Sequence, residues 1–134
     1  MRFALYALLS VTLMLPCYTY AADDDQEGKP AQTFYHSLEP SIVVNLSKGA
    51  KFGRVDIQLM TTNEEQLENI KLHTPAVRHE LILLLSEQKG STLKTLEGKE
   101  EFRKVALSAV QGVIEDLTGV DSIDDLFFTS FFVQ

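Results

Sequence analysis

The chain has 134 residues, a net charge of −7 from 12 basic and 19 acidic side chains, and a hydrophobic content of 45%. This size suits one domain, and the apolar fraction is high enough for a packed core, which argues against a disordered chain. The acidic balance argues against sequence-independent nucleic-acid binding, which needs lysine and arginine to neutralise phosphates. A single cysteine excludes an internal disulfide.

The N-terminus has the order of a secretory signal. Arg2 precedes an apolar run over 3–15, and the small residues Ala21 and Ala22 precede three aspartates. A positive end, an apolar stretch and a small-residue cleavage site are the parts of such a signal. We therefore expect residues 1–21 to be a signal peptide, cleaved after Ala21.

Two alternatives for this segment stay open. It could remain as a short membrane anchor, because the run counted to Ala22 reaches the roughly 20 residues that a membrane span needs. It could also carry a lipid on Cys17, although Pro16 stands where a small residue is expected. Cleavage would remove the cysteine, so the remaining chain would be held together by its core alone.

Residues 22–33 are polar and acidic and contain Gly28 and Pro30. This composition indicates an acidic flexible linker. We expect the rest of the chain, residues 34–134, to form one domain.

The first part of this domain is expected to be a β-hairpin. A strand over Ile42–Leu46 is followed by a glycine-containing turn over 47–52. In the second strand Val55, Ile57 and Leu59 alternate with polar residues, which indicates one buried face and one wet face. Two strands this close are expected to pair antiparallel.

A broken helix is expected next. Thr62 or Asn63 can cap its first segment, and Thr74 followed by Pro75 suits the start of a second segment that ends near Gln88, before a glycine. Its expected apolar positions are Leu67, Ile70 and Leu72 in the first segment and Val77, Leu81, Leu84 and Leu85 in the second.

A long helix is expected from Leu96 or Glu97 to Gly119, a residue suited to a helix end. Apolar residues recur along it at helical spacing and predict a stripe down one side. They are Phe102, Val105, Ala106, Ala109, Val110, Val113, Ile114 and Leu117.

The chain ends in a predicted strand over 126–133 that is apolar on both faces. Regular alternation places Leu126, Phe128 and Phe132 on one face and Phe127, Phe131 and Val133 on the other. A free sheet edge of this kind promotes association. The sequence therefore predicts that a partner covers part of this strand. We expect the interface to include Phe127, Phe128, Phe131, Phe132 and Arg78.

Little in the sequence points to catalysis. His73 and His79 are six residues apart with a proline between them, whereas a helical metal pair needs a spacing of four. No serine has a nucleophile-elbow context and no glycine-rich loop could hold a phosphate. Arg78 and Arg103 are expected to form ion pairs or to contact a partner. We expect no catalytic residues, no cofactor and no metal.

The stretch from Tyr35 to Gln134 carries short motifs in a fixed order. They are Leu38-Glu39-Pro40 before Val43-Val44-Asn45-Leu46, Arg54-Val55-Asp56-Ile57-Gln58-Leu59, His73-Thr74-Pro75-Ala76-Val77-Arg78, Glu97-Gly98-Lys99, and the terminal Leu126-Phe127-Phe128-Thr129-Ser130-Phe131-Phe132-Val133-Gln134. In this order they make the stretch resemble the periplasmic domain of the flagellar basal-body-associated FliL family.

The resemblance implies an α+β fold of the stomatin-like type, with a small antiparallel sheet, made of the hairpin and the C-terminal strand, against the broken helix and the long helix. It implies a non-enzymatic protein of flagellum-dependent motility and chemotaxis, with stator and basal-body proteins as partners and a homo-oligomeric ring in the periplasm. Membrane association stays open, because family members typically have a full membrane span. The alternative is a periplasmic small-ligand or lipid-binding module that uses the same phenylalanines as a pocket.

Overall fold

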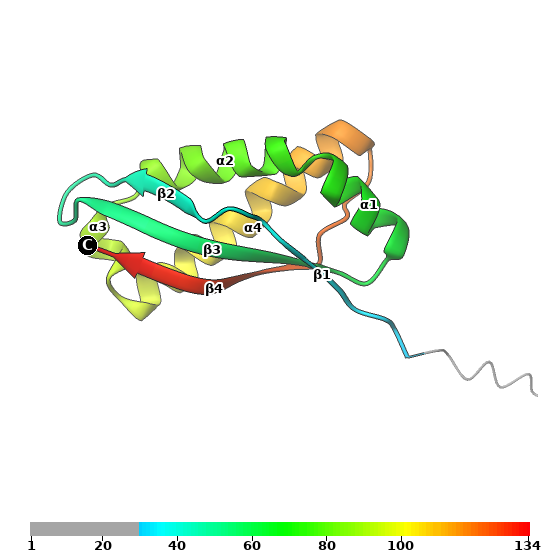
Figure 1. Ribbon diagram of the computed structural model, residues 1–134, viewed down its shortest axis with the longest axis horizontal. Helices are drawn as coiled ribbons and strands as arrows, with labels where there is room; N and C mark the ends of the chain where they lie inside the picture. Colours follow the sequence, from blue (N-terminus) through cyan, green and yellow to red (C-terminus); the bar gives the residue numbers. More distant parts are fainter. Residues whose placement is uncertain (1–29) are drawn as a thin grey trace, which may run out of the picture.

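The computed structural model describes residues 30–134 (Figure 1). The predictions for 1–21 and for most of 22–33 lie outside the described residues. The elements are β1 (Phe34–Ser37), β2 (Ile42–Asn45), β3 (Phe52–Thr61), α1 (Glu64–Leu72), α2 (Thr74–Ser86), α3 (Gly90–Leu93), α4 (Leu96–Thr118) and β4 (Asp125–Val133).

The sheet is antiparallel and is built around β3. The strands β1 and β2 pair with the two halves of β3 along one side, and β4 pairs with nearly its whole length on the other. The predicted hairpin of β2 with β3, and the C-terminal strand, are confirmed. The four-residue strand β1 was not predicted, because it is too short to show a convincing alternation.

One face of the sheet carries the core. The alternating residues Val55, Ile57 and Leu59 of β3 are fully buried, and the helices lie over them on one side of the sheet (Figure 1). Burial of such side chains stabilises the fold by roughly 1.5–3 kcal/mol each. The resulting structure has the α+β class expected from the sequence, with one sheet face covered and the other open.

The broken helix is confirmed, with two corrections. Asn63 caps α1 through its side-chain oxygen, which accepts from the amides of Glu65 and Gln66. Thr74 was expected to cap α2, but its hydroxyl donates back to the main-chain oxygen of Ile70 at 3.0 Å, and α2 has no side-chain cap. Leu72 was expected at an apolar position and is 72% exposed instead, because it is the last residue of α1.

The glycine after α2 lies at a close chain crossing. Gly90 does not simply end that helix but begins the short helix α3, and its amide donates to the main-chain oxygen of Ser47 at 2.9 Å. The loop between β2 and β3 is thereby held against the loop between α2 and α3. A Cβ at position 90 would overlap Ala50, so only glycine fits there.

The long helix α4 begins at Leu96, as expected, and is capped after Thr118 by Gly119, whose φ of 79° lies in the left-handed region. Its buried stripe consists of Phe102, Ala106, Val110 and Ile114 with Gly98. Two members of the predicted stripe, Val105 and Leu117, are about half exposed, since they lie at its margins.

The predicted facing of β4 is wrong beyond its middle. The ladder shifts between Asp56 and Ile57, so that Thr129 is an extra residue opposite the shift. A bulge of this kind reverses the alternation. Phe131 therefore packs against the core together with Phe128, whereas Phe132 is 51% exposed.

Candidate interaction surface

The open face of the sheet carries two exposed aromatic pairs. Tyr35 of β1 and Phe127 of β4 have ring centroids 6.5 Å apart, and Phe52 of β3 and Phe132 of β4 lie 6.1 Å apart. Tyr35 and Phe132 are each more than half exposed. The pairs lie near opposite ends of β4, because its partners in register are Gln58 for Phe127 and Arg54 for Phe132.

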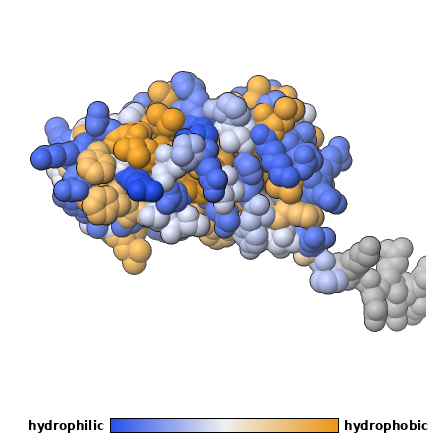
Figure 2. Space-filling model, viewed as in Figure 1, coloured by the Kyte–Doolittle hydropathy of each residue, from blue (hydrophilic) through white to orange (hydrophobic). Residues whose placement is uncertain are grey.

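The residues between the two pairs are polar. Arg54, Asp56 and Gln58 of β3 lie on this face, and Ser130 of β4 is exposed beside them. In the view of Figure 2, hydrophobic side chains form separate areas interspersed with hydrophilic ones. Exposed aromatic residues are enriched at protein contact surfaces relative to the rest of a protein surface.

The four phenylalanines predicted as one interface belong to two different environments. Phe127 and Phe132 lie on the open face. Phe128 stacks on Phe102 of α4, with centroids 5.8 Å apart, and meets Phe131 edge-on at 4.8 Å. Phe128 and Phe131 thus pack against the core from the end of the sheet that faces α4.

Arg78 is not part of that surface. Its Nη1 donates to the main-chain oxygens of Leu38 at 3.1 Å and Pro40 at 2.5 Å, and it thereby holds the corner between β1 and β2. It lies on the side of the sheet opposite β4, with β3 between them. Within residues 30–134 Arg78 does not form the ion pair that the sequence predicted, because its guanidinium binds these carbonyl groups instead.

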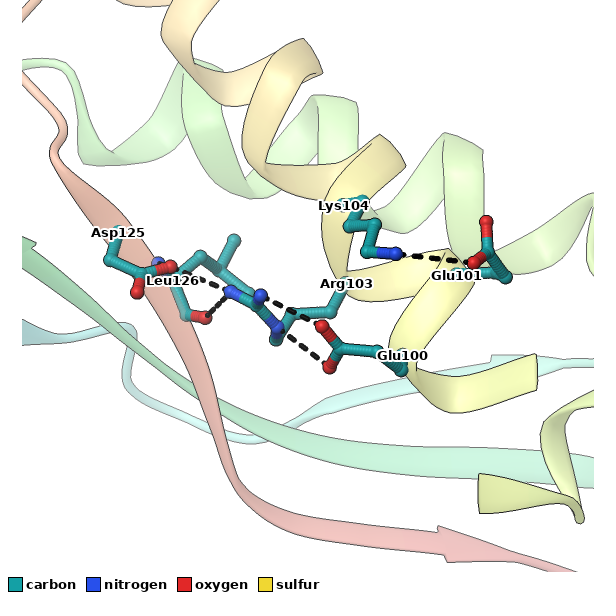
Figure 3. A network of polar contacts seen from close by, with 6 residues as sticks. All are labelled: Glu100, Glu101, Arg103, Lys104, Asp125 and Leu126. Carbon is teal, nitrogen blue, oxygen red and sulfur yellow. Dashed lines mark hydrogen bonds and ion pairs between the residues drawn. The ribbon is translucent and has the colours of Figure 1, made fainter. Parts of the chain in front are cut away.

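Arg103 forms the ion pairs that the sequence predicted. Its guanidinium contacts Glu100 at 2.9 Å and Asp125 at 2.6 Å, and it also donates to the main-chain oxygen of Leu126 at 3.2 Å (Figure 3). The hydrogen bond to Glu100 raises the pKa of Arg103, and the same bond lowers the pKa of Glu100. The neighbouring Lys104 pairs with Glu101 at the surface.

His36 connects the sheet to the helices. Its Nε2 lies 2.8 Å from the hydroxyl oxygen of Thr74. Because that hydroxyl already donates its hydrogen to the main-chain oxygen of Ile70, the imidazole is the donor in the contact between His36 and Thr74. Partial burial lowers the pKa of His36, and the charge of Lys71 on α1 lowers it further. His36 is not among the site residues expected from the sequence, because the strand that carries it, β1, is too short to show a convincing alternation.

Within 30–134 no group of three or more metal-ligating side chains comes together. No helix in this part of the chain is long and apolar enough to cross a membrane.

The fold and this surface define a small α+β domain whose candidate site is an exposed contact surface. A family model described as flagellar basal body-associated protein FliL matches residues 35–134, and the chain belongs to this family of flagellar basal-body-associated proteins. The chain is also similar to a curated relative, "Flagellar protein FliL" of Aquifex aeolicus (strain VF5), at 22% identity over 107 residues. That match covers 78% of this chain and 64% of the relative's length.

Proposed function

We propose that this protein is a non-enzymatic assembly component of the flagellar motor that supports the stator in motility and chemotaxis. It acts in the periplasm by self-association and by contact with stator and basal-body proteins. Its N-terminal segment 1–21 is either a cleaved signal or an inner-membrane anchor.

The observation that supports this proposal is the presence of two exposed aromatic pairs on the open sheet face. Phe127 is 37% exposed and Phe132 is 51% exposed, and each is already fixed by a neighbouring ring. Rigid aromatic side chains lose little conformational entropy on binding, and they are enriched at the centres of interfaces. Membership of a basal-body-associated family supplies the setting in which such a partner is met.

The test is complementation of a strain lacking the gene with the full chain carrying Phe127→Ser and Phe132→Ser together. We expect swimming in soft agar to fall toward that of the deletion strain, most clearly when viscosity raises the load. Both side chains lie outside the core, so the thermal midpoint of the purified variant should stay close to that of the wild type.

The matched control removes two apolar side chains of greater exposure from the helices. Leu72→Ser with Leu117→Ser replaces residues that are 72% and 52% exposed. This variant should swim like the wild type. Normal swimming of the phenylalanine variant under load, at normal abundance, would refute the role of the open face, and normal swimming of the deletion strain would refute the motor function.

The location is tested separately. N-terminal sequencing of the protein from fractionated cells distinguishes a cleaved periplasmic form, beginning at Ala22, from an inner-membrane form that keeps residues 1–21. Recovery of the protein in the cytoplasm would contradict both forms of the proposal.

A further inference from the structure

The strand β4 is an edge strand with a free outer side. It pairs only with β3 among the described residues. Gln134 exchanges two hydrogen bonds with Phe52, at 3.0 Å and 2.9 Å. Since bonded pairs alternate in an antiparallel ladder, the main-chain groups of Val133 and Phe131 point away from β3.

The same alternation, carried past the bulge, directs the main-chain groups of Phe128 and Leu126 outward. At Leu126 these groups are already satisfied. Its amide donates to Asp125 Oδ1 at 2.7 Å and its oxygen accepts from Arg103. The ion pair therefore closes one end of the edge, while no hydrogen bond within 30–134 satisfies the outward groups from Phe128 to Val133.

A groove of about 400 Å³ runs beside the open part of this edge. The first turns of α4 form one wall through Leu96, Lys99 and the ion-paired Glu100 and Arg103, and β4 forms the other through Phe127, Phe128 and Phe131. Leu96 is 85% exposed, although it is a large apolar residue. The groove thus offers an apolar wall directly next to unpaired main-chain donors and acceptors.

The groove also contains a cation without a carboxylate partner in the described chain. Lys99 lies with its Nζ 5.2 Å from the ring centroid of Phe131, whereas Arg103, the other cation of the groove, is paired with Glu100 and Asp125. A carboxylate entering the groove would meet this ammonium at a partly buried position.

We propose that the β4 edge from Phe128 to Val133 binds an extended segment of a partner protein, which adds a short strand to the sheet and places apolar and acidic side chains in the groove at alternate positions. Strand addition derives affinity from main-chain hydrogen bonds and specificity from pockets for alternate side chains. The inference deepens the proposed function and rests on it for the setting of the partner. It concerns the edge of β4, whose groove shares Phe127 with the open sheet face.

The probe is the hexapeptide Thr-Val-Thr-Glu-Thr-Val, acetylated at its N-terminus and amidated at its C-terminus. It is added to ¹⁵N-labelled protein that is expressed from the full-length gene and purified in the N-terminal form that the cells produce. We expect chemical-shift changes at β4 and the start of α4. Amide hydrogen exchange at Phe131 and Val133 should slow by about tenfold when the peptide saturates the protein. Shift changes elsewhere, or unprotected edge amides, would overturn the proposal.

Two variants test the main-chain contacts. Val133→Pro removes an outward amide without touching the ladder to β3, and Val133→Ala shortens the same side chain but keeps the amide. Proline should weaken peptide binding by about tenfold or more relative to alanine. Equal affinities of two folded variants would show that the edge amides are not used.

A charge exchange tests the groove independently of the proline variant. Lys99→Glu should weaken binding of the glutamate peptide and favour the same peptide with lysine in place of glutamate. Lys104→Glu makes the same charge change outside the groove and should leave the preference unchanged. An unaltered preference in Lys99→Glu would refute the acidic occupant.

Amide hydrogen exchange is also measured on the protein without peptide, at several protein concentrations. Protection of Phe131 and Val133 that grows with protein concentration would assign the edge to a second copy of the chain, and protection independent of concentration would assign it to the chain itself. Either result overturns the proposal. If the peptide binds the wild-type protein but a strain carrying Val133→Pro swims normally, the β4 edge is not required for the proposed motor function.

Discussion

Arg103 on α4 donates a hydrogen bond of 3.2 Å to the main-chain oxygen of Leu126, a residue of β4 whose main-chain groups point away from β3. The same guanidinium is held by Asp125 and by Glu100 (Figure 3). A charged side chain on a strand edge protects it against unwanted pairing. The network therefore shortens the open edge of a strand that is otherwise strongly apolar.

The first prediction concerns this edge. Replacing Arg103 by methionine should lower the free energy of unfolding by about 1–2 kcal/mol, because partly buried hydrogen bonds to charged groups are lost. It should also increase self-association, since the open edge then extends to Leu126. Urea unfolding and sedimentation velocity measure the two effects.

Lys104→Met is the matched control for Arg103. It removes an exposed pair on the next residue of α4, so stability should change by less than about 0.5 kcal/mol. An Arg103→Met variant that is as stable and as monomeric as this control would contradict the protective role.

The second prediction concerns the bulge in β4. Deletion of Thr129 together with Ser130 would place Phe131 opposite Asp56 in a regular ladder and should turn Phe131 and Val133 out of the core. The expected loss of stability is about 3 kcal/mol or more, as for removal of a large core side chain.

Thr129→Ala keeps the extra residue and loses one exposed hydrogen bond to the main-chain oxygen of Asp56. It should cost about 1 kcal/mol or less. Chemical denaturation of the two variants decides the matter: similar midpoints would mean that the bulge does not set the facing of the aromatic residues.

The third prediction compares two glycines. Gly90→Ala should destabilise the protein by about 1–3 kcal/mol, because the new Cβ would lie 2.8 Å from the amide nitrogen of Ala50 and overlap its side chain. Gly112→Ala meets nothing within 4 Å in the interior of α4 and should stabilise by about 0.5–1 kcal/mol. Thermal unfolding should therefore move in opposite directions, and a shift of the same sign in both variants would contradict the close crossing at Gly90.

The fourth prediction concerns pH. Burial lowers the pKa of His36 below its ordinary value of 6.5 in the folded protein. As the pH falls through that value, the unfolded chain takes up the proton first, so stability decreases and levels off below the folded-state pKa. His36→Gln removes this titration.

The measurement is the difference in unfolding free energy between about pH 7.5 and about pH 5.5, a window that lies above most carboxylate titrations. The wild type should lose more stability over it than His36→Gln. The exposed imidazole of His79, replaced in the same way, serves as the control. Identical losses in the wild type and in His36→Gln would exclude His36 as the group responsible.

Local signals predicted much of the secondary structure. The alternation of Val55, Ile57 and Leu59 indicated β3, and helical periodicity around Phe102 indicated α4, because these periods follow from backbone geometry alone. The cap at Asn63 and the left-handed end at Gly119 were equally readable, since each depends on one side chain or on the lack of one.

The candidate site was predicted only in part. The surplus of phenylalanines in the last strand was evident from the sequence, and so was a pairing role for Arg103. The division of those phenylalanines between the core and the open face was not, because one bulge at Thr129 reverses the alternation and depends on the neighbouring strand. The position of Arg78 at the corner between β1 and β2 was not evident either, since its carbonyl partners, at Leu38 and Pro40, are distant in the sequence.

By itself, the sequence determined the α+β class, the order of the major elements and the resemblance to a family. Each of these depends on periodicity and on the order of motifs along the chain. Tertiary structure alone decided which aromatic rings face solvent, which end of β4 is closed by Arg103 and where the groove beside Lys99 lies. These features depend on strand register and on side chains from separate elements, and both are set by packing across the whole domain.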